Sequence, residues 1–237
     1  MILYVNGDSH SAGAEAVNQH CFANDDTNYR HLGRVPHPDN KSVSYGALLA
    51  NNLNLTLQCS AESGGSNTRI IRTTREYLKN NPRPTAIIIG WATWEREEFL
   101  FDNIYYQFSS GWQIEDWPKD VVDFYKQWAI NCNPLNRVAY WHDEIFKFHK
   151  ELLAANIPHL FFNTYHSFNN SFITTVDWDN NYIDPYNHSG SYYYWLEGQG
   201  FKTVPNSFHY RANAHQAWAD FLLPHLTNIL KESIITT

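Results

Sequence analysis

A serine and a histidine stand near opposite ends of this chain, each at a place where a side chain becomes available for chemistry. Ser9 closes the tripeptide Gly7-Asp8-Ser9, which is separated from the apolar run 2–5 only by Asn6. Glycine lets the backbone turn sharply, and a strand that ends in this way presents the serine hydroxyl at the sheet edge where open α/β folds bind ligands. His209 lies on a segment that leads into residues with apolar side chains at helical spacing. The simplest alternative for Ser9 is that it only caps the following helix.

Together, the two ends of the chain resemble the SGNH (GDSL-like) hydrolase family. Members pair a Gly-Asp-Ser near the N-terminus with a histidine just before the last helix, and a second histidine further on precedes Trp-Ala. His209 and His215 keep the family spacing, and Trp218-Ala219 follow them. The resemblance implies that Ser9 is a nucleophile and that His209 is its general base. The tryptophan-rich block 90–96 is similar to that of members encoded by bacteriophages.

The resemblance also implies where an oxyanion would be held. Gly64 matches the family glycine whose backbone N–H joins that of Ser9 in an oxyanion hole, although a glycine turn needed only for backbone geometry is the alternative. The family asparagine after the third strand is replaced by Ala92 and Thr93. We expect the Thr93 hydroxyl or the Asn67 side chain to take its place, since a lost donor costs about 10²–10³ in rate.

A further departure from the family concerns the acid that orients the histidine. The aspartate of the family motif Asp-x-x-His would fall at Asn206. An asparagine oxygen can accept the His209 Nδ1–H and fix the tautomer, although it does not neutralise the imidazolium as a carboxylate does. We therefore predict Asn206 in this role. The alternative sources of the charge are Asp177, Asp179 and Asp184.

Four further residues are candidates for substrate binding. His10 neighbours Ser9, and Arg96 could hold a substrate carboxylate or phosphate with two hydrogen bonds, its alternative being a salt bridge with a neighbouring glutamate. Aromatic residues make up 16% of the chain, and we expect some of them to line a groove on which sugars stack. The predicted set is Asp8, His10, Trp91 and Arg96.

Composition restricts the remaining function classes. With 237 residues, of which 43% are hydrophobic and 17% charged, the chain fits one domain over residues 1–237. A net charge of −7 without any basic run argues against nucleic-acid binding. The three cysteines form neither a metal-ligand pattern nor a disulfide framework, and we expect no metal and no cofactor. The N-terminus enters the first strand without a signal-peptide or membrane-span pattern, which predicts a cytoplasmic protein or, for a viral one, a place in the host cytoplasm or virion.

Apolar patterning predicts strands that alternate with helices. Short apolar runs indicate strands at 2–5, 53–59, 85–90 and 157–163. Helical spacing indicates helices at 44–50, 67–80, 138–156 and 213–232. Loops are predicted at 14–44, with a turn cluster at 36–40, and at 101–137 and 164–200. This order predicts a three-layer α/β/α, flavodoxin-like parallel sheet of about five strands, with helices on both faces and long aromatic loop insertions.

Two hypotheses of different classes follow. The first is a serine hydrolase of the SGNH type, of the carboxylesterase or carbohydrate O-acetylesterase kind, acting on a small-molecule or carbohydrate ester. The second is a non-catalytic SGNH-like module that binds carbohydrate or has a structural role, which the changes at positions 92, 93 and 206 favour. A nucleotide binder fits less well, because the glycine-rich segment 63–67 has neither a Walker lysine nor Gly-x-Gly-x-x-Gly. Neither hypothesis fixes an oligomeric state.

Overall fold

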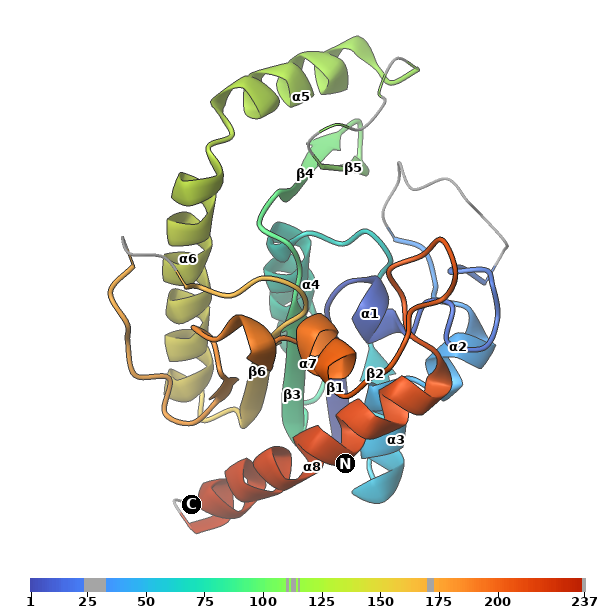
Figure 1. Ribbon diagram of the computed structural model, residues 1–237. Coiled ribbons are helices and arrows are strands. Elements are labelled where there is room, and N and C mark those ends of the chain that lie inside the picture. Colours follow the sequence, from blue (N-terminus) through green and yellow to red (C-terminus); the bar gives the residue numbers. More distant parts are fainter. Residues whose placement is uncertain (24–32, 110, 112–113, 115, 170–172, 236–237) are drawn as a thin grey trace.

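The centre of the fold is a sheet of five parallel strands in the order β2-β1-β3-β6-β7 (Figure 1). The strands are β1 (Ile2–Asn6), β2 (Thr56–Cys59), β3 (Ala86–Trp91), β6 (His159–Asn163) and β7 (Tyr182–Ile183). With the strands of a separate hairpin left out, this is the flavodoxin-like order, so the predicted α/β/α sheet is confirmed. The computed structural model describes residues 1–23, 33–109, 111, 114, 116–169 and 173–235.

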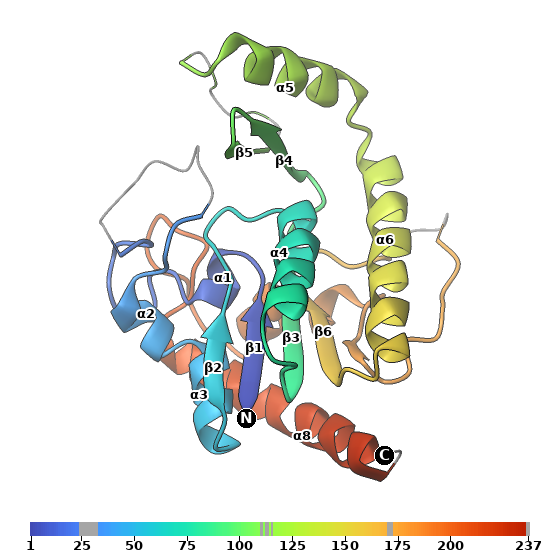
Figure 2. The same ribbon diagram turned by 180° about the vertical axis from the view of Figure 1, so that it is seen from behind.

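Helices cover both faces of the sheet because successive residues of its central strands point to opposite sides. Leu3 and Val5 of β1 belong to one core cluster, and Tyr4 between them belongs to the other. Figures 1 and 2 show the two helical layers in turn. On the first face lie α3 (Tyr45–Asn52), α7 (Tyr192–Gly198) and α8 (Ala212–Ile235), and on the second lie α4 (Asn67–Asn80) and α6 (Pro134–Ala154).

The main helices begin at polar residues that satisfy their first N–H groups. Ser44 accepts a hydrogen bond from the N–H of Ala47 at the start of α3, and Ser66 accepts one from the N–H of Arg69 at the start of α4. Such caps stabilise a helix by about 1 kcal/mol. The short helix α1 (Ser9–Ala12) is separated from β1 only by Gly7 and Asp8.

The segment 101–137, predicted as a loop, holds regular structure instead. β4 (Arg96–Phe101) pairs antiparallel with β5 (Ile104–Ser109), and α5 (Lys119–Asn131) packs against this hairpin. Asp102 and Asn103 connect the strands with φ angles of 49° and 62°, as a two-residue hairpin turn requires. Figure 1 shows this unit beyond the carboxyl ends of the sheet strands. Its small separate core includes Tyr106, Phe108, Trp117, Val121 and Tyr125.

Two other predicted loops also contain regular elements. The turn cluster at 36–40 is the start of helix α2 (Pro38–Ser42), because His37 caps its first turn and a proline suits the first helical position. The segment 164–200 contributes α7, the 3₁₀ turn His188–Gly190, and β7, which pairs with β6 and completes the sheet. Residues 24–32 and 170–172 of these predicted loops lie outside the described part of the chain.

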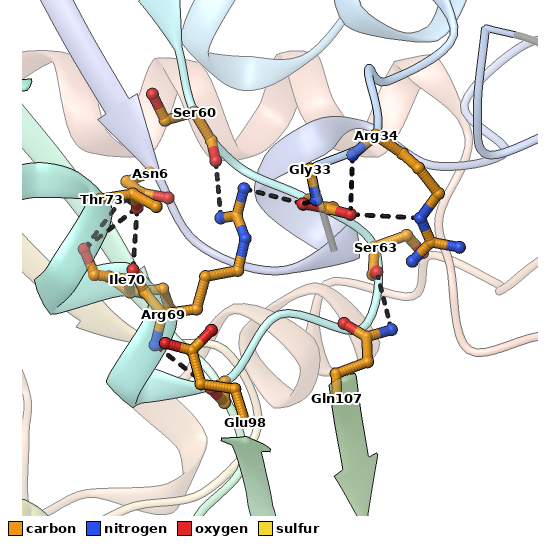
Figure 3. A network of polar contacts seen from close by, with 12 residues as sticks. Asn6, Gly33, Arg34, Ser60, Ser63, Arg69, Ile70, Thr73, Glu98 and Gln107 are labelled. Carbon is orange, nitrogen blue, oxygen red and sulfur yellow. Dashed lines mark hydrogen bonds and ion pairs between the residues drawn. The ribbon is translucent and has the colours of Figure 1, made fainter. Parts of the chain in front are cut away.

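A buried glutamate fixes the loop that follows β2. The Glu62 carboxylate accepts hydrogen bonds from the Gly33 N–H at 2.9 Å and from Arg34 Nε at 3.2 Å. It also pairs with Arg69 of α4 at 2.8 Å (Figure 3). A fully buried carboxylate is tolerated only with such partners, so this network holds the loop that carries Gly64 in one conformation.

The described residues contain no helix that is both long and apolar enough to cross a membrane. Within the same residues, no group of three or more histidine, cysteine, aspartate or glutamate side chains is arranged to hold a metal ion. The expectation that the chain needs neither a metal nor a cofactor stays a prediction.

Candidate active site

A cleft of about 480 Å³ opens at the carboxyl edge of the sheet, beyond the neighbouring strands β1 and β3. β2 pairs with one side of β1 and β3 with the other, so the strand order reverses at β1. Open α/β sheets bind ligands at such a reversal. The cleft gathers side chains from segments that are far apart in the sequence. Its lining residues are Asp8, Ser9, His10, Ser63, Gly64, Thr93, Arg96, Tyr165, His166, Phe208 and His209.

Ser9, the predicted nucleophile, is the first residue of α1 and lines this cleft. Asp8 caps the helix, since its Oδ1 accepts a hydrogen bond from the His10 backbone N–H at 3.1 Å. Gly7 before it has a φ of 153°, and a Cβ there would clash with the Gly90 carbonyl oxygen. The turn therefore requires glycine, as the sequence indicated.

His209 lies on the turn before α8, and an acid from the other end of the chain holds its ring. Glu15 Oε2 is 2.5 Å from His209 Nδ1, and Ser207 Oγ donates to the same carboxylate oxygen. The Ser207 hydroxyl oxygen in turn accepts a hydrogen bond from the His209 backbone N–H at 3.2 Å. A carboxylate only accepts, so Nδ1 carries the proton and Nε2 remains available to the cleft. This hydrogen bond lowers the pKa of Glu15.

The structure places Glu15, not Asn206, against His209 Nδ1. Asn206 is exposed and has a left-handed φ of 60°. The alternative Asp179 is engaged elsewhere, with its carboxylate 3.2 Å from His149 Nε2 and 3.1 Å from Lys150 Nζ. Sequence reasoning missed both Glu15 and Ser207.

The Ser9 hydroxyl and the His209 ring line the same cleft, and no hydrogen bond joins them in the described part of the chain. Catalytic hydrogen bonds are often long without substrate and shorten when substrate binds. The His10 ring packs edge-on against His209, with 5.2 Å between the ring centroids. Burial lowers the pKa of His10 well below its usual value, so His10 stays neutral and adds no second charge beside His209.

Ser9 and Gly64 both line the cleft, and neither backbone N–H has a hydrogen-bond acceptor among the described residues, which is also true of the N–H groups of Ser63, Thr93 and Phe208. Gly64 has a φ of 84°, and a Cβ there would clash with the Gln107 side chain, so only glycine fits. An oxyanion hole requires N–H groups that have no other acceptor and lie in the same cleft as the nucleophile. Ser9 and Gly64, the pair predicted to hold an oxyanion, thus line the same cleft, and their role as donors stays a prediction.

Of the two side chains predicted to replace the missing asparagine, only that of Thr93 belongs to a residue that lines the cleft. Asn67 is fully buried and binds one backbone unit, because its Nδ2 donates to the Ala92 carbonyl at 3.2 Å and its Oδ1 accepts from the Ala92 N–H at 2.8 Å. Asn67 thus ties the start of α4 to the end of β3 and is not among the cleft residues, contrary to expectation.

Arg96 reaches the cleft through an ion pair with Asp8. Its Nη1 is 3.0 Å from Asp8 Oδ2, and within the described part of the chain Asp8, not a neighbouring glutamate, is its ion-pair partner. Burial raises the pKa of the Asp8 carboxyl, and the Arg96 charge opposes that shift. The Arg96 side chain is 22% exposed, which leaves part of the guanidinium open to a ligand.

Trp91 does not line the cleft, contrary to its predicted role in substrate binding. Its side chain is fully buried in the core on the face of the sheet that α4 and α6 cover. The centroid of its ring lies 5.1 Å from that of Phe161 and 6.2 Å from that of Phe148. Tyr165 and Phe208 are the aromatic residues of the cleft wall instead. Phe208 is 67% exposed, which makes its ring face accessible.

No protein-family model matches the chain, and no curated protein matches it. Solved structures with a similar chain course include a carbohydrate esterase whose active site has divergent catalytic and non-catalytic binding functions (19% identity, TM-score 0.45). Others are a carbohydrate esterase family 2 enzyme with a carbohydrate-binding domain from Corynascus thermopiles (Myceliophthora fergusii; 17%, 0.43) and an acetyl xylan esterase from the rumen bacterium Butyrivibrio proteoclasticus (15%, 0.44). Each alignment covers 97% of this chain and, in the same order, 70%, 66% and 64% of the other. Similarity this remote assigns neither a family nor a substrate.

Proposed function

We propose that the chain is a serine hydrolase of the SGNH (GDSL-like) type that cleaves ester bonds, with Ser9 as nucleophile and His209 as general base. The observation that carries the proposal is that Ser9, His209 and Gly64 line one cleft. Within the described residues, the backbone N–H groups of Ser9 and Gly64 have no hydrogen-bond acceptor there. The motif spacing at both ends of the chain supports the same proposal. The coarser part, an ester hydrolase, does not depend on the subtype.

In the proposed reaction, Ser9 Oγ attacks the ester carbonyl carbon while His209 Nε2 takes the hydroxyl proton. The oxyanion of the tetrahedral intermediate accepts hydrogen bonds from the backbone N–H groups of Ser9 and Gly64. Collapse of the intermediate expels the alcohol, which takes the proton from His209, and leaves an acyl group on Ser9. A water molecule, deprotonated by His209, then hydrolyses this acyl-enzyme to the free acid and restores the serine.

The proposed substrate class is a carbohydrate O-acetyl ester, with a simple carboxylic ester as the broader possibility. The exposed ring of Phe208 and the Tyr165 ring flank the candidate nucleophile, and flat aromatic faces suit the apolar faces of sugar rings. Tyr165 is itself backed by Tyr193, with 4.5 Å between ring centroids. A ring supported in this way offers a rigid contact surface at low cost in side-chain entropy.

The proposal is tested by the hydrolysis of p-nitrophenyl acetate and of an acetylated xylo-oligosaccharide. Ser9→Ala and His209→Ala should each lower kcat by at least about 10³-fold, as expected for members of one catalytic unit. Ser63→Ala removes another serine hydroxyl from the same cleft and should retain activity. Hydrolysis that survives both Ser9→Ala and His209→Ala would overturn the assignment.

A non-catalytic carbohydrate-binding module is the second candidate. It is favoured by the absence of an amide donor at Ala92 and Thr93 together with the engagement of Asn67 by backbone groups. Such a module would bind an oligosaccharide in calorimetry while Ser9 stayed inert to an organophosphonate probe. The bacteriophage origin, the cytoplasmic location and the single domain stay predictions.

A further inference from the structure

We propose that Glu15 is the acid that orients His209, so that the carboxylate comes from the turn after the nucleophile helix and not from the histidine loop. The inference rests on the proposed function, because it adds a role within the same site. Glu15 contacts His209 and would touch no reacting atom, which makes it a positioning residue.

The contact between the two side chains has the geometry that this role needs. Glu15 Oε2 lies 2.5 Å from His209 Nδ1, which is closer than the roughly 2.7–2.9 Å usual for a charge-assisted N–H···O hydrogen bond. With Nδ1–H directed at the carboxylate, Nε2 is the unprotonated ring nitrogen of a histidine that lines the same cleft as Ser9. When His209 takes the serine proton, the carboxylate faces the imidazolium that forms and stabilises it. An amide at this place would accept the hydrogen bond without neutralising the charge.

The backbone around Glu15 connects the nucleophile to the histidine loop. The Ala14 N–H donates to the Ser9 carbonyl at 2.9 Å, and the Ala212 N–H at the start of α8 donates to the Ala16 carbonyl at 3.1 Å. Glu15 between them has a φ of 59°, a left-handed conformation that costs a non-glycine residue about 1–3 kcal/mol and persists where the surroundings fix it. One turn therefore sets the position of the acid relative to both partners.

Ser207 completes the arrangement from the histidine side. Its hydroxyl donates to Glu15 Oε2 and accepts from the His209 backbone N–H. Arg211 binds the Glu15 carbonyl oxygen through Nη1 at 3.1 Å, and its charge further favours the ionised carboxylate. The other titratable groups near His209 are Asp8, His10 and His215.

Kinetics of Glu15→Gln, Glu15→Asp and Asn206→Gly on p-nitrophenyl acetate test this inference, glycine being chosen at position 206 because its φ is 60°. Glu15→Gln should lower kcat by about 10²–10⁴-fold, because an amide in place of the acid of a serine-protease triad costs about 10⁴. KM should change little, and the acidic limb of the pH profile of kcat/KM should move to lower pH, because the amide does not stabilise the imidazolium. Glu15→Asp should recover part of the lost activity, and Asn206→Gly should behave like the unchanged protein.

The outcomes separate this inference from the proposed function. Unchanged kcat and pH profile in Glu15→Gln, with Ser9→Ala inactive, would overturn the role of Glu15 alone. Full activity of Ser9→Ala would overturn the proposed function. If Glu15→Gln fails to fold, proton NMR of the unchanged protein decides the question, since a carboxylate-bound imidazole N–H should give a downfield resonance that is lost in His209→Gln and kept in Asn206→Gly. Absence of that resonance, or its loss in Asn206→Gly, would overturn the role of Glu15.

Discussion

Glu15 Oε2 and His209 Nδ1 lie 2.5 Å apart, although 194 positions separate the two residues in the chain. They meet because the turn after α1 and the turn before α8 lie together at the carboxyl edge of the sheet, where the Ala212 N–H binds the Ala16 carbonyl. The positions of the candidate nucleophile and the candidate base are therefore linked through these two turns. A change in either turn should affect both residues.

Ser207→Ala should lower kcat by about 3–10-fold, the equivalent of one hydrogen bond of roughly 1 kcal/mol. The Ser207 hydroxyl donates to Glu15 and accepts from the His209 N–H, so its removal loosens the pair without deleting either member. Ser207→Thr keeps the hydroxyl and serves as the control. Steady-state kinetics that show no change in Ser207→Ala, or a loss as large as that of His209→Ala, would contradict this prediction.

Gly64→Ala should lower both stability and turnover. The φ of 84° at Gly64 and the clash of a Cβ with Gln107 predict a loss of about 1–3 kcal/mol in the free energy of unfolding. The displaced N–H should reduce kcat by about 10²-fold. Gly198→Ala is the matched control, because a Cβ there meets no atom within 4 Å. Urea unfolding and kinetics on both variants measure the effect, and equal behaviour of the two would be inconsistent with it.

Trp91→Ala should lower the stability of the fold, whereas Phe208→Ala should weaken substrate binding. Trp91 is fully buried, so its truncation should reduce the free energy of unfolding by about 3–5 kcal/mol and leave KM unchanged in the folded fraction. Phe208 is 67% exposed and lines the cleft, so its loss should raise KM for a carbohydrate ester by about 2–10-fold with little effect on stability. A raised KM in Trp91→Ala without destabilisation would restore its predicted role in binding.

His215 should make the fold sensitive to acid. Burial lowers the pKa of His215 to about 3 from its usual value of 6.5, so the folded protein keeps the ring neutral while the unfolded chain takes up a proton. The stability is complete above pH 6.5 and is lost progressively as the pH falls towards 3, by about 2 kcal/mol at pH 5. In His215→Phe this loss should disappear. Urea unfolding at pH 7 and pH 5 measures it, and an equal drop in both proteins would argue against the effect.

Much of the sheet was predictable because its signals are local. The continuous apolar run at 85–90 indicated a strand buried on both faces, and β3 is fully buried. The hairpin β4–β5 was missed because its strands show no regular alternation of apolar and polar residues and its turn, Asp102-Asn103, lacks the glycine of the usual hairpin dipeptides. β7 has only two residues, too few to produce a pattern, and its position depends on pairing with β6.

The candidate site divides in the same way. Ser9, Gly64 and His209 carry local signals, since each stands in a short motif beside a strand or a helix. Glu15 carries none, because its contact with His209 depends on a left-handed glutamate and on two turns meeting across the chain. Composition identified Trp91 as a candidate but did not indicate that its side chain faces the core.

The most direct test of the account is covalent labelling of the unchanged protein with a fluorophosphonate, followed by mass spectrometry of its peptides. Attack by an activated serine should place the adduct on Ser9. Labelling should be slowed strongly in His209→Ala, be abolished in Ser9→Ala and persist in Ser63→Ala. A protein that takes up no label, or that is still labelled when Ser9 is alanine, would contradict the claim that this chain is a serine hydrolase acting through Ser9.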